Sequence, residues 1–166
     1  PIMGNSSSAA RGLWWNGLAD NGPSLWDDTA PQNDMASIAR DHNGFRYRPD
    51  DHGDTAATAT WLDSTATEFT GAGIIERTSD ADYFKFQIYT RGYVEASVSV
   101  VAVGPNLDAR LELQNADGTV VIASASTEEV LSESLGRTLD PGEYRLVVLS
   151  QGHYGDVGQY TVNVSP

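Results

Sequence analysis

The chain has 166 residues with 40% hydrophobic side chains, enough for one ordinary domain with its own core, or for one domain with an arm. Its formal net charge of -13 disfavours phosphate-rich partners and anionic membrane surfaces, so we expect no nucleic acid partner. The absence of cysteine excludes disulfides and thiolate zinc sites, and no apolar run approaches the roughly 20 residues that membrane insertion by a helix needs.

Residues 1–54 have the composition of a loop-rich N-terminal arm. They hold three of the four tryptophans and many Gly, Asn, Asp, Ser and Pro residues, with little alternation of apolar and polar side chains. One short helix is expected from about Pro31 to Arg40, capped by Asp28 or Thr29, with Asp34 near its positive end. The residues that would share its apolar face are Met35, Ile38 and Ala39.

Residues 55–166 alternate apolar and polar side chains in short runs separated by turn signals. Asn115-Ala116-Asp117-Gly118, for example, is typical of a hairpin turn. About eight short strands with this spacing predict an all-β fold, an antiparallel β-sandwich or jelly roll. The expected strands are Ala57–Leu62, Asp82–Tyr89, Tyr93–Val101, Leu107–Leu113, Val120–Ala123, one around Leu131 and Leu135, Glu143–Leu149 (burying Tyr144, Leu146 and Val148 or the opposite set) and Gly158–Val164.

Four motifs in this second part occur in the order found in one known family. The sequence Ser79-Asp80-Ala81-Asp82-Tyr83-Phe84-Lys85-Phe86 resembles a D-x-D-x-F-x-F strand, and the others are Gly104–Leu113, Leu139–Leu146 and Gly158–Val162. As an ordered set they resemble the bacterial pre-peptidase C-terminal domain over about residues 55–166. The resemblance implies a jelly-roll-like sandwich, often with bound calcium, that follows the catalytic domain of a secreted protease.

The arm resembles the end of a different domain. Pro1-Ile2-Met3-Gly4 resembles the Met-turn region of a metzincin metalloprotease, Gln32–Ile38 its last helix, and Tyr47–Asp54 the junction to a C-terminal domain. The zinc motif H-E-x-x-H-x-x-G-x-x-H of these proteases is absent from the sequence. We therefore expect no zinc and no enzyme activity, and we interpret the chain as a processed or excised piece that begins after the catalytic helix.

The three histidines, at positions 42, 52 and 153, are too scattered to suggest a zinc site, and we interpret them as solvated loop residues. The carboxylates are better candidates. Family members place calcium between the N-terminal junction and the loop before the Phe84 strand. On that basis Asp80 and Asp82 are the preferred ligands, with Asp51 and Asp54 contributing. The alternative is that all four are solvated turn residues, because aspartate favours turns.

The function expected from these observations is a non-catalytic accessory module of a secreted bacterial metalloprotease, acting in targeting, stabilisation or maturation. Its partner would be the parent catalytic domain. One alternative is an extracellular structural or adhesion subunit that self-assembles when the arm reaches neighbouring copies. Another is a module that binds a polysaccharide or protein ligand through exposed aromatic side chains. The candidate aromatic residues are Trp14, Trp15, Trp26, Trp61, Tyr89, Tyr93 and Tyr154, with the arm tryptophans better explained as anchors of the arm.

Overall fold

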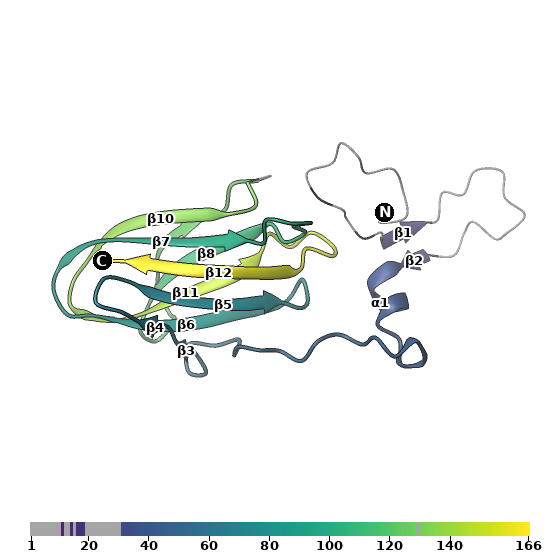
Figure 1. Cartoon of the computed structure of the whole chain (residues 1–166), viewed down its shortest axis with the longest axis horizontal. Helices are drawn as coiled ribbons and strands as arrows, with labels where there is room; N and C mark the ends of the chain where they lie inside the picture. The colour runs from purple at the N-terminus through teal and green to yellow at the C-terminus, as the bar shows by residue number, and fades with distance from the viewer. Residues whose placement is uncertain (1–10, 12–13, 15, 19–30, 129) are drawn as a thin grey trace, which may run out of the picture.

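The chain forms a β-sandwich of two five-stranded sheets, with the arm at one end (Figure 1). A computed structural model describes residues 11, 14, 16–18, 31–128 and 130–166. One sheet has the strand order β3-β6-β11-β8-β9 and the other the order β10-β7-β12-β5-β4. Every pairing in these two sheets is antiparallel except that of β3 with β6. The predicted antiparallel sandwich is confirmed, with ten strands in place of about eight.

The first sheet consists of β3 (Thr60–Trp61), β6 (Ala81–Ile88), β11 (Gly142–Ser150), β8 (Ala109–Asn115) and β9 (Val121–Ala125). The second consists of β10 (Glu133–Leu139), β7 (Gly92–Val100), β12 (Gly158–Ser165), β5 (Phe69–Ile75) and β4 (Asp63–Ser64).

The core lies between the sheets and follows the predicted alternation. In β6, Phe84, Phe86 and Ile88 are buried while the residues between them face outward. The hairpin turn forms where the sequence predicts it, with the amide of Gly118 donating to the carbonyl of Asn115. The other inward-facing residues include Val94, Ala96, Val98, Leu107, Ala109, Leu111, Leu113, Leu146, Val148, Tyr160, Val162 and Val164. Burial of apolar surface along both faces explains why this pattern specifies the fold.

Strand β5 was not predicted, because its glycines resemble a loop signal. Gly73 faces the Tyr160 ring so closely that a Cβ atom there would lie 2.3 Å from the tyrosine hydroxyl oxygen. At Gly71 a Cβ atom would lie 2.7 Å from a methyl carbon of Leu62. Glycine inside a strand marks such close approach, so both residues are required by the packing of the strand.

The chain between arm and sandwich crosses the outer face of the first sheet. The carbonyl of Gly53 accepts from the amide of Tyr83 at 3.2 Å, and Nε of Arg145 donates to the carbonyl of Ala56 at 2.9 Å. On the same strand Val147, which faces outward, is buried along with its inward neighbours. Buried side chains therefore occur on both faces of β11, whereas the sequence analysis expected only one of the two alternating sets of side chains to be buried.

In the arm, β1 (Asn16–Leu18) pairs antiparallel with β2 (Pro31–Asn33), a two-stranded sheet that the sequence did not predict. Helix α1 (Asp34–Ile38) and the 3-10 turn η1 (Asp41–Asn43) follow. The predicted helix limits were wrong at both ends. No described helix has the length and apolar character needed to cross a membrane.

The helix begins later than predicted because Asn33 caps it. The Oδ1 atom of Asn33 accepts from the amide of Ala36 at 2.8 Å, the hydrogen bond expected of an N-cap residue. The predicted caps, Asp28 and Thr29, lie outside the described residues. Asp34 is in the first turn, as predicted.

Arg11 fastens the arm to the sandwich. Its Nη1 atom donates to Oδ1 of Asp156 at 2.8 Å, and its Nη2 atom lies 3.4 Å from Oδ2 of Asp108. Both carboxylates are buried, with exposed fractions of 0% and 1%. Nearby, Trp14 lies directly against Gly155. The positive charge of the arm therefore compensates two acidic groups that the sandwich has removed from water.

Asn33 and Met35 make a second contact between arm and sandwich. The hydroxyl of Tyr154 donates to Oδ1 of Asn33 at 2.6 Å and accepts from the amide of Met35 at 2.9 Å. The loop after β11 thus holds both the start of the arm and the start of its helix.

Replacing Arg11 by alanine should destabilise the chain by about 3 kcal/mol, the lower end of the cost of leaving buried carboxylates unpaired, since the arginine itself is slightly exposed. The matched control is Arg91→Ala, because the pair of Arg91 with Asp140 is largely exposed and should contribute at most about 1 kcal/mol. Urea unfolding of the two variants measures the difference. Equal, small losses would contradict the anchoring role of Arg11.

Candidate metal centre

Asp82 is a carboxylate buried at the rim of the sandwich. It lies in β6, on the same inward face as Phe84, and its exposed fraction is 0%. Its Oδ2 atom accepts a hydrogen bond from the hydroxyl of Tyr160. Its Oδ1 atom is buried and has no hydrogen-bond partner among the described residues. An ionised oxygen in this position is costly unless another group compensates it.

The junction segment brings two more carboxylates to this rim. Oδ1 of Asp51 accepts from the amide of Ile74 at 3.4 Å, which places the segment beside β5. Oδ1 of Asp50 accepts from the amide of His52 at 3.0 Å and stabilises the turn. The sequence of this junction segment, Tyr47–Asp54, therefore favours a tight turn that directs acidic side chains toward the sandwich.

His52 holds the junction segment in place. Its Nδ1 atom lies 3.1 Å from Oγ1 of Thr60 and its Nε2 atom 2.9 Å from the carbonyl oxygen of Ala72. Its ring centroid lies 4.5 Å from that of Phe84. The interpretation of this histidine as a solvated loop residue is wrong, because both ring nitrogens and one ring face contact the sandwich.

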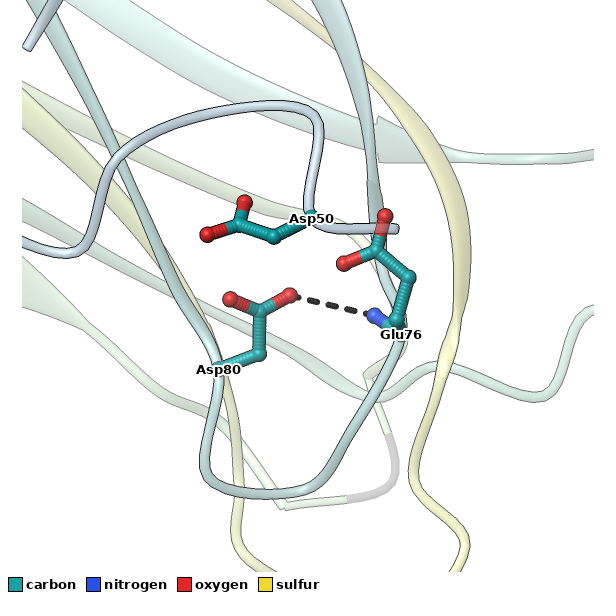
Figure 2. A group of neighbouring side chains, drawn as sticks. All are labelled: Asp50, Glu76 and Asp80. Carbon is teal, nitrogen blue, oxygen red and sulfur yellow. Dashed lines mark hydrogen bonds between the residues drawn. The ribbon is translucent and has the colours of Figure 1, made fainter. Parts of the chain in front are cut away.

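The connection between β5 and β6 supplies the remaining carboxylates. Glu76 follows directly after β5 and is buried, with an exposed fraction of 8%. Its amide donates to Oδ2 of Asp80 at 3.1 Å. Figure 2 shows the side chains of Asp50, Glu76 and Asp80 gathered about a common space, with Asp50 coming from the junction segment.

Among the described residues, two overlapping groups have the spacing of metal ligands, and they share Asp50. Within each group, one oxygen of every carboxylate lies within 4.8 Å of the others. Oxygen ligands lie about 2.3–2.6 Å from a calcium ion, so oxygens within this limit can be bound by one ion. The groups are Asp50, Glu76 and Asp80, and Asp50, Asp51 and Asp82.

Of the four residues expected from sequence, Asp51 and Asp82 fall in one group, Asp80 falls in the other, and Asp54 belongs to neither. Asp50 was part of the same acidic turn but was not selected. Glu76 could not be selected, because it follows the strand that the sequence did not reveal.

The electrostatics of the cluster oppose ionisation of all its members. Burial raises the pKa of Asp82 from 3.8 to about 8, with the carboxylates of Asp80 and Asp51 adding to the effect and the hydrogen bond from Tyr160 opposing it. Burial also raises the pKa of Glu76 to about 8, and the neighbouring Asp80 carboxyl adds to this. The pKa of Asp80 is raised as well, mainly by burial. Burial and like charge both favour the neutral forms.

None of the ion pairs among the described residues involves a member of this cluster. The buried pair of Asp108 and Asp156, in contrast, contacts Arg11. The cluster therefore offers a set of oxygen ligands of the kind that a hard divalent cation binds, and two of them, Oδ1 of Asp82 and Oε1 of Glu76, are buried without a hydrogen-bond partner among the described residues. Neither group contains a histidine, so the ligand set does not suit zinc.

No protein-family model and no curated protein sequence matches the chain. Among solved structures, the periplasmic inhibitor of g-type lysozyme PliG from Aeromonas hydrophila is 12% identical over 64% of this chain and 94% of its own, with a TM-score of 0.48. The pre-peptidase C-terminal domain of a Bacillus anthracis collagenase is 18% identical over 71% of this chain and 96% of its own, with a TM-score of 0.45.

A carbohydrate-binding module of Cellvibrio mixtus lichenase 5A is 12% identical over 63% of this chain and 91% of its own, with a TM-score of 0.33. At these identities and scores the comparisons assign neither a family nor a function. The sandwich architecture rests on the strand order and register of the chain itself.

The stability of the metal-free chain should fall as the pH rises from about 4 to about 8. Asp82 and Glu76 keep their protons in the folded state, where each pKa is about 8, but lose them in the unfolded state, where the ordinary values are 3.8 and 4.5. The folded state thus binds more protons across this range, which lowers the free energy of unfolding as pH increases.

Urea unfolding at several pH values in the presence of a chelator measures this dependence. Asp82→Asn should make the slope shallower by up to about 1.4 kcal/mol per pH unit, because one titrating group is removed. Asp63→Asn, at an exposed position in β4, is the matched control and should leave the slope unchanged. A metal-free chain whose stability rises between pH 4 and pH 8 would contradict this description of the cluster.

Proposed function

We propose that the chain is a non-catalytic accessory module of a secreted bacterial metalloprotease, in which calcium fastens the junction segment to a pre-peptidase-type sandwich. The observation that carries the proposal is buried Asp82: its Oδ1 atom has no hydrogen-bond partner among the described residues, and one of its carboxylate oxygens lies within 4.8 Å of oxygens from Asp50 and Asp51. Two of these three residues belong to the junction segment and one to the sandwich. A cation bound by all three would link the two parts.

The free-energy balance supports this assignment. Without a cation, folding must either keep protons on Asp82 and Glu76 or bury negative charge beside other carboxylates. A calcium ion supplies two positive charges and accepts six to eight oxygen ligands in flexible geometry. Carboxylates, backbone carbonyls and water can together supply that number, so the three carboxylates of one group need not complete the shell.

The sequence resemblance supports the choice of parent protein. The motif that contains Asp80 and Asp82 occupies the start of β6, the position that the resemblance implies. The Met-turn-like residues, 1–4, lie outside the described residues, so a metalloprotease parent rests on sequence alone. Attachment of the sandwich to such an enzyme would give it a role in targeting, stabilisation or maturation outside the cell.

Millimolar calcium should raise the melting temperature of the chelator-treated chain. A ligand at a hundredfold excess over its Kd contributes about 2.7 kcal/mol, which corresponds to roughly 5–10 °C for a domain of this size. Asp82→Asn and Asp51→Asn should abolish the increment, whereas Asp54→Asn, which lies outside both groups, and the control Asp63→Asn should retain it. Differential scanning calorimetry measures the shift, and an unchanged melting curve for the wild-type chain contradicts the calcium site.

Calcium should also slow cleavage by trypsin after the exposed Arg46, because the ion fixes the neighbouring junction segment. Mass spectrometry of timed digests with and without chelator identifies the cut.

Under the same conditions the purified chain should not hydrolyse casein, since it lacks the zinc motif. The non-catalytic role would be contradicted if a homogeneous sample hydrolysed casein in the presence of zinc and lost this activity when a chelator was added.

A further inference from the structure

A second feature lies at the opposite end of the sandwich, where β5 begins and β6 ends (Figure 1). A hollow of about 560 Å³ is lined there by residues 64–69 and 87–90, together with Trp61, Leu62 and Pro166. The carboxylate cluster occupies the other ends of the same two strands. The hollow is large enough for a small ligand or for one stretch of a polymer.

Two aromatic rings line this hollow and remain exposed. The exposed fraction is 54% for Trp61 and 82% for Tyr89. Lys85, the register partner of Trp61 in β6, places its Nζ atom 5.1 Å from the centre of the indole ring and does not itself line the hollow. The lysine therefore supports the indole from outside. Exposed, supported rings in a concave surface are more informative than scattered exposed apolar residues.

The polar wall of the hollow is held rigidly. The amide of Thr65 donates to the carbonyl of Glu68 at 2.8 Å, and the Oγ1 atom of Thr65 accepts from the amides of Thr67 and Glu68 at 3.3 and 3.2 Å. Oε2 of Glu68 accepts from Nδ2 of Asn163 at 2.6 Å, which fixes the direction of the carboxylate. A wall already fixed before binding reduces the entropy cost of ordering a ligand.

We infer that this hollow binds a neutral polysaccharide, with Trp61 and Tyr89 stacking on sugar rings. A pyranose ring has an apolar C–H face and a rim of hydroxyl groups, which matches aromatic rings beside threonine hydroxyls and a fixed carboxylate. An anionic chain is disfavoured by Glu68 and by the net charge of -13. A purely apolar ligand would displace water from the polar wall without replacing the hydrogen bonds that the water makes. This ligand class goes beyond the accessory role proposed above.

The test is a titration of the 15N-labelled chain, followed by two-dimensional NMR, with cellohexaose, maltohexaose and chitohexaose as separate probes. At least one probe should shift the amide signals of residues 64–69 and 87–90 in a saturable manner. Trp61→Ala and Tyr89→Ala should each weaken that binding at least about tenfold. Tyr93→Ala is the matched control, because Tyr93 is exposed by 64% and does not line the hollow, so its affinity should equal that of the wild type.

The inference is wrong if no probe at about 10 mM shifts these signals, since that concentration is tenfold above even a weak Kd of about 1 mM. It is also wrong if binding survives both aromatic substitutions, or if only unfolded casein, offered as a protein probe, binds at these residues. The chelator-treated wild-type chain should bind sugar as the calcium-loaded chain does, because the carboxylate cluster lies at the other end of the sandwich. Loss of the calcium response and loss of sugar binding are therefore separate outcomes.

Discussion

Burial of acidic side chains at one end of the sandwich is the constraint on which the arrangement of the arm depends. Asp108 and Asp156 are almost fully buried and are compensated by the guanidinium of Arg11. Asp82 is buried to the same extent, but the charged groups that shift its pKa are all carboxylates. The same physical problem thus arises at two places at this end of the sandwich, and at only one of them do the described residues solve it with an internal cation. The proposed calcium ion is the second solution.

Arg11 contacts the sandwich near the beginning of the arm, and the proposed calcium ion would bind at the junction of the arm with the sandwich. Neither involves the other end of β5 and β6, where Trp61 and Tyr89 line a hollow that faces solvent. The sandwich is therefore organised with structural charge at one end and exposed aromatic surface at the other. Under the proposals made above, the charged end would face the preceding domain and the aromatic end would bind the ligand.

Local pattern was sufficient to predict most of the fold but only part of the site. The alternation of apolar and polar side chains identified strands such as β6, because a strand with one buried face needs apolar residues at every second position. Strand β5 was not predicted, because Gly71 and Gly73 are needed to let neighbouring side chains pack closely against the strand. This packing exists only in the folded chain. Glu76 was missed along with that strand. The hydrogen bond between Tyr160 and Asp82 joins residues 78 positions apart, and no local signal in the sequence announces it.

Proton release on calcium binding tests the account most directly. At pH 7 the metal-free cluster should hold protons on Asp82 and Glu76, whose pKa values are both about 8, and calcium requires the ionised carboxylates. Isothermal titration calorimetry at pH 7, repeated in buffers with different ionisation enthalpies, counts the protons released. Release of about one to two protons per bound ion is the predicted result. Binding with no proton release, or no binding at millimolar calcium, would contradict a buried carboxylate site that the cation completes.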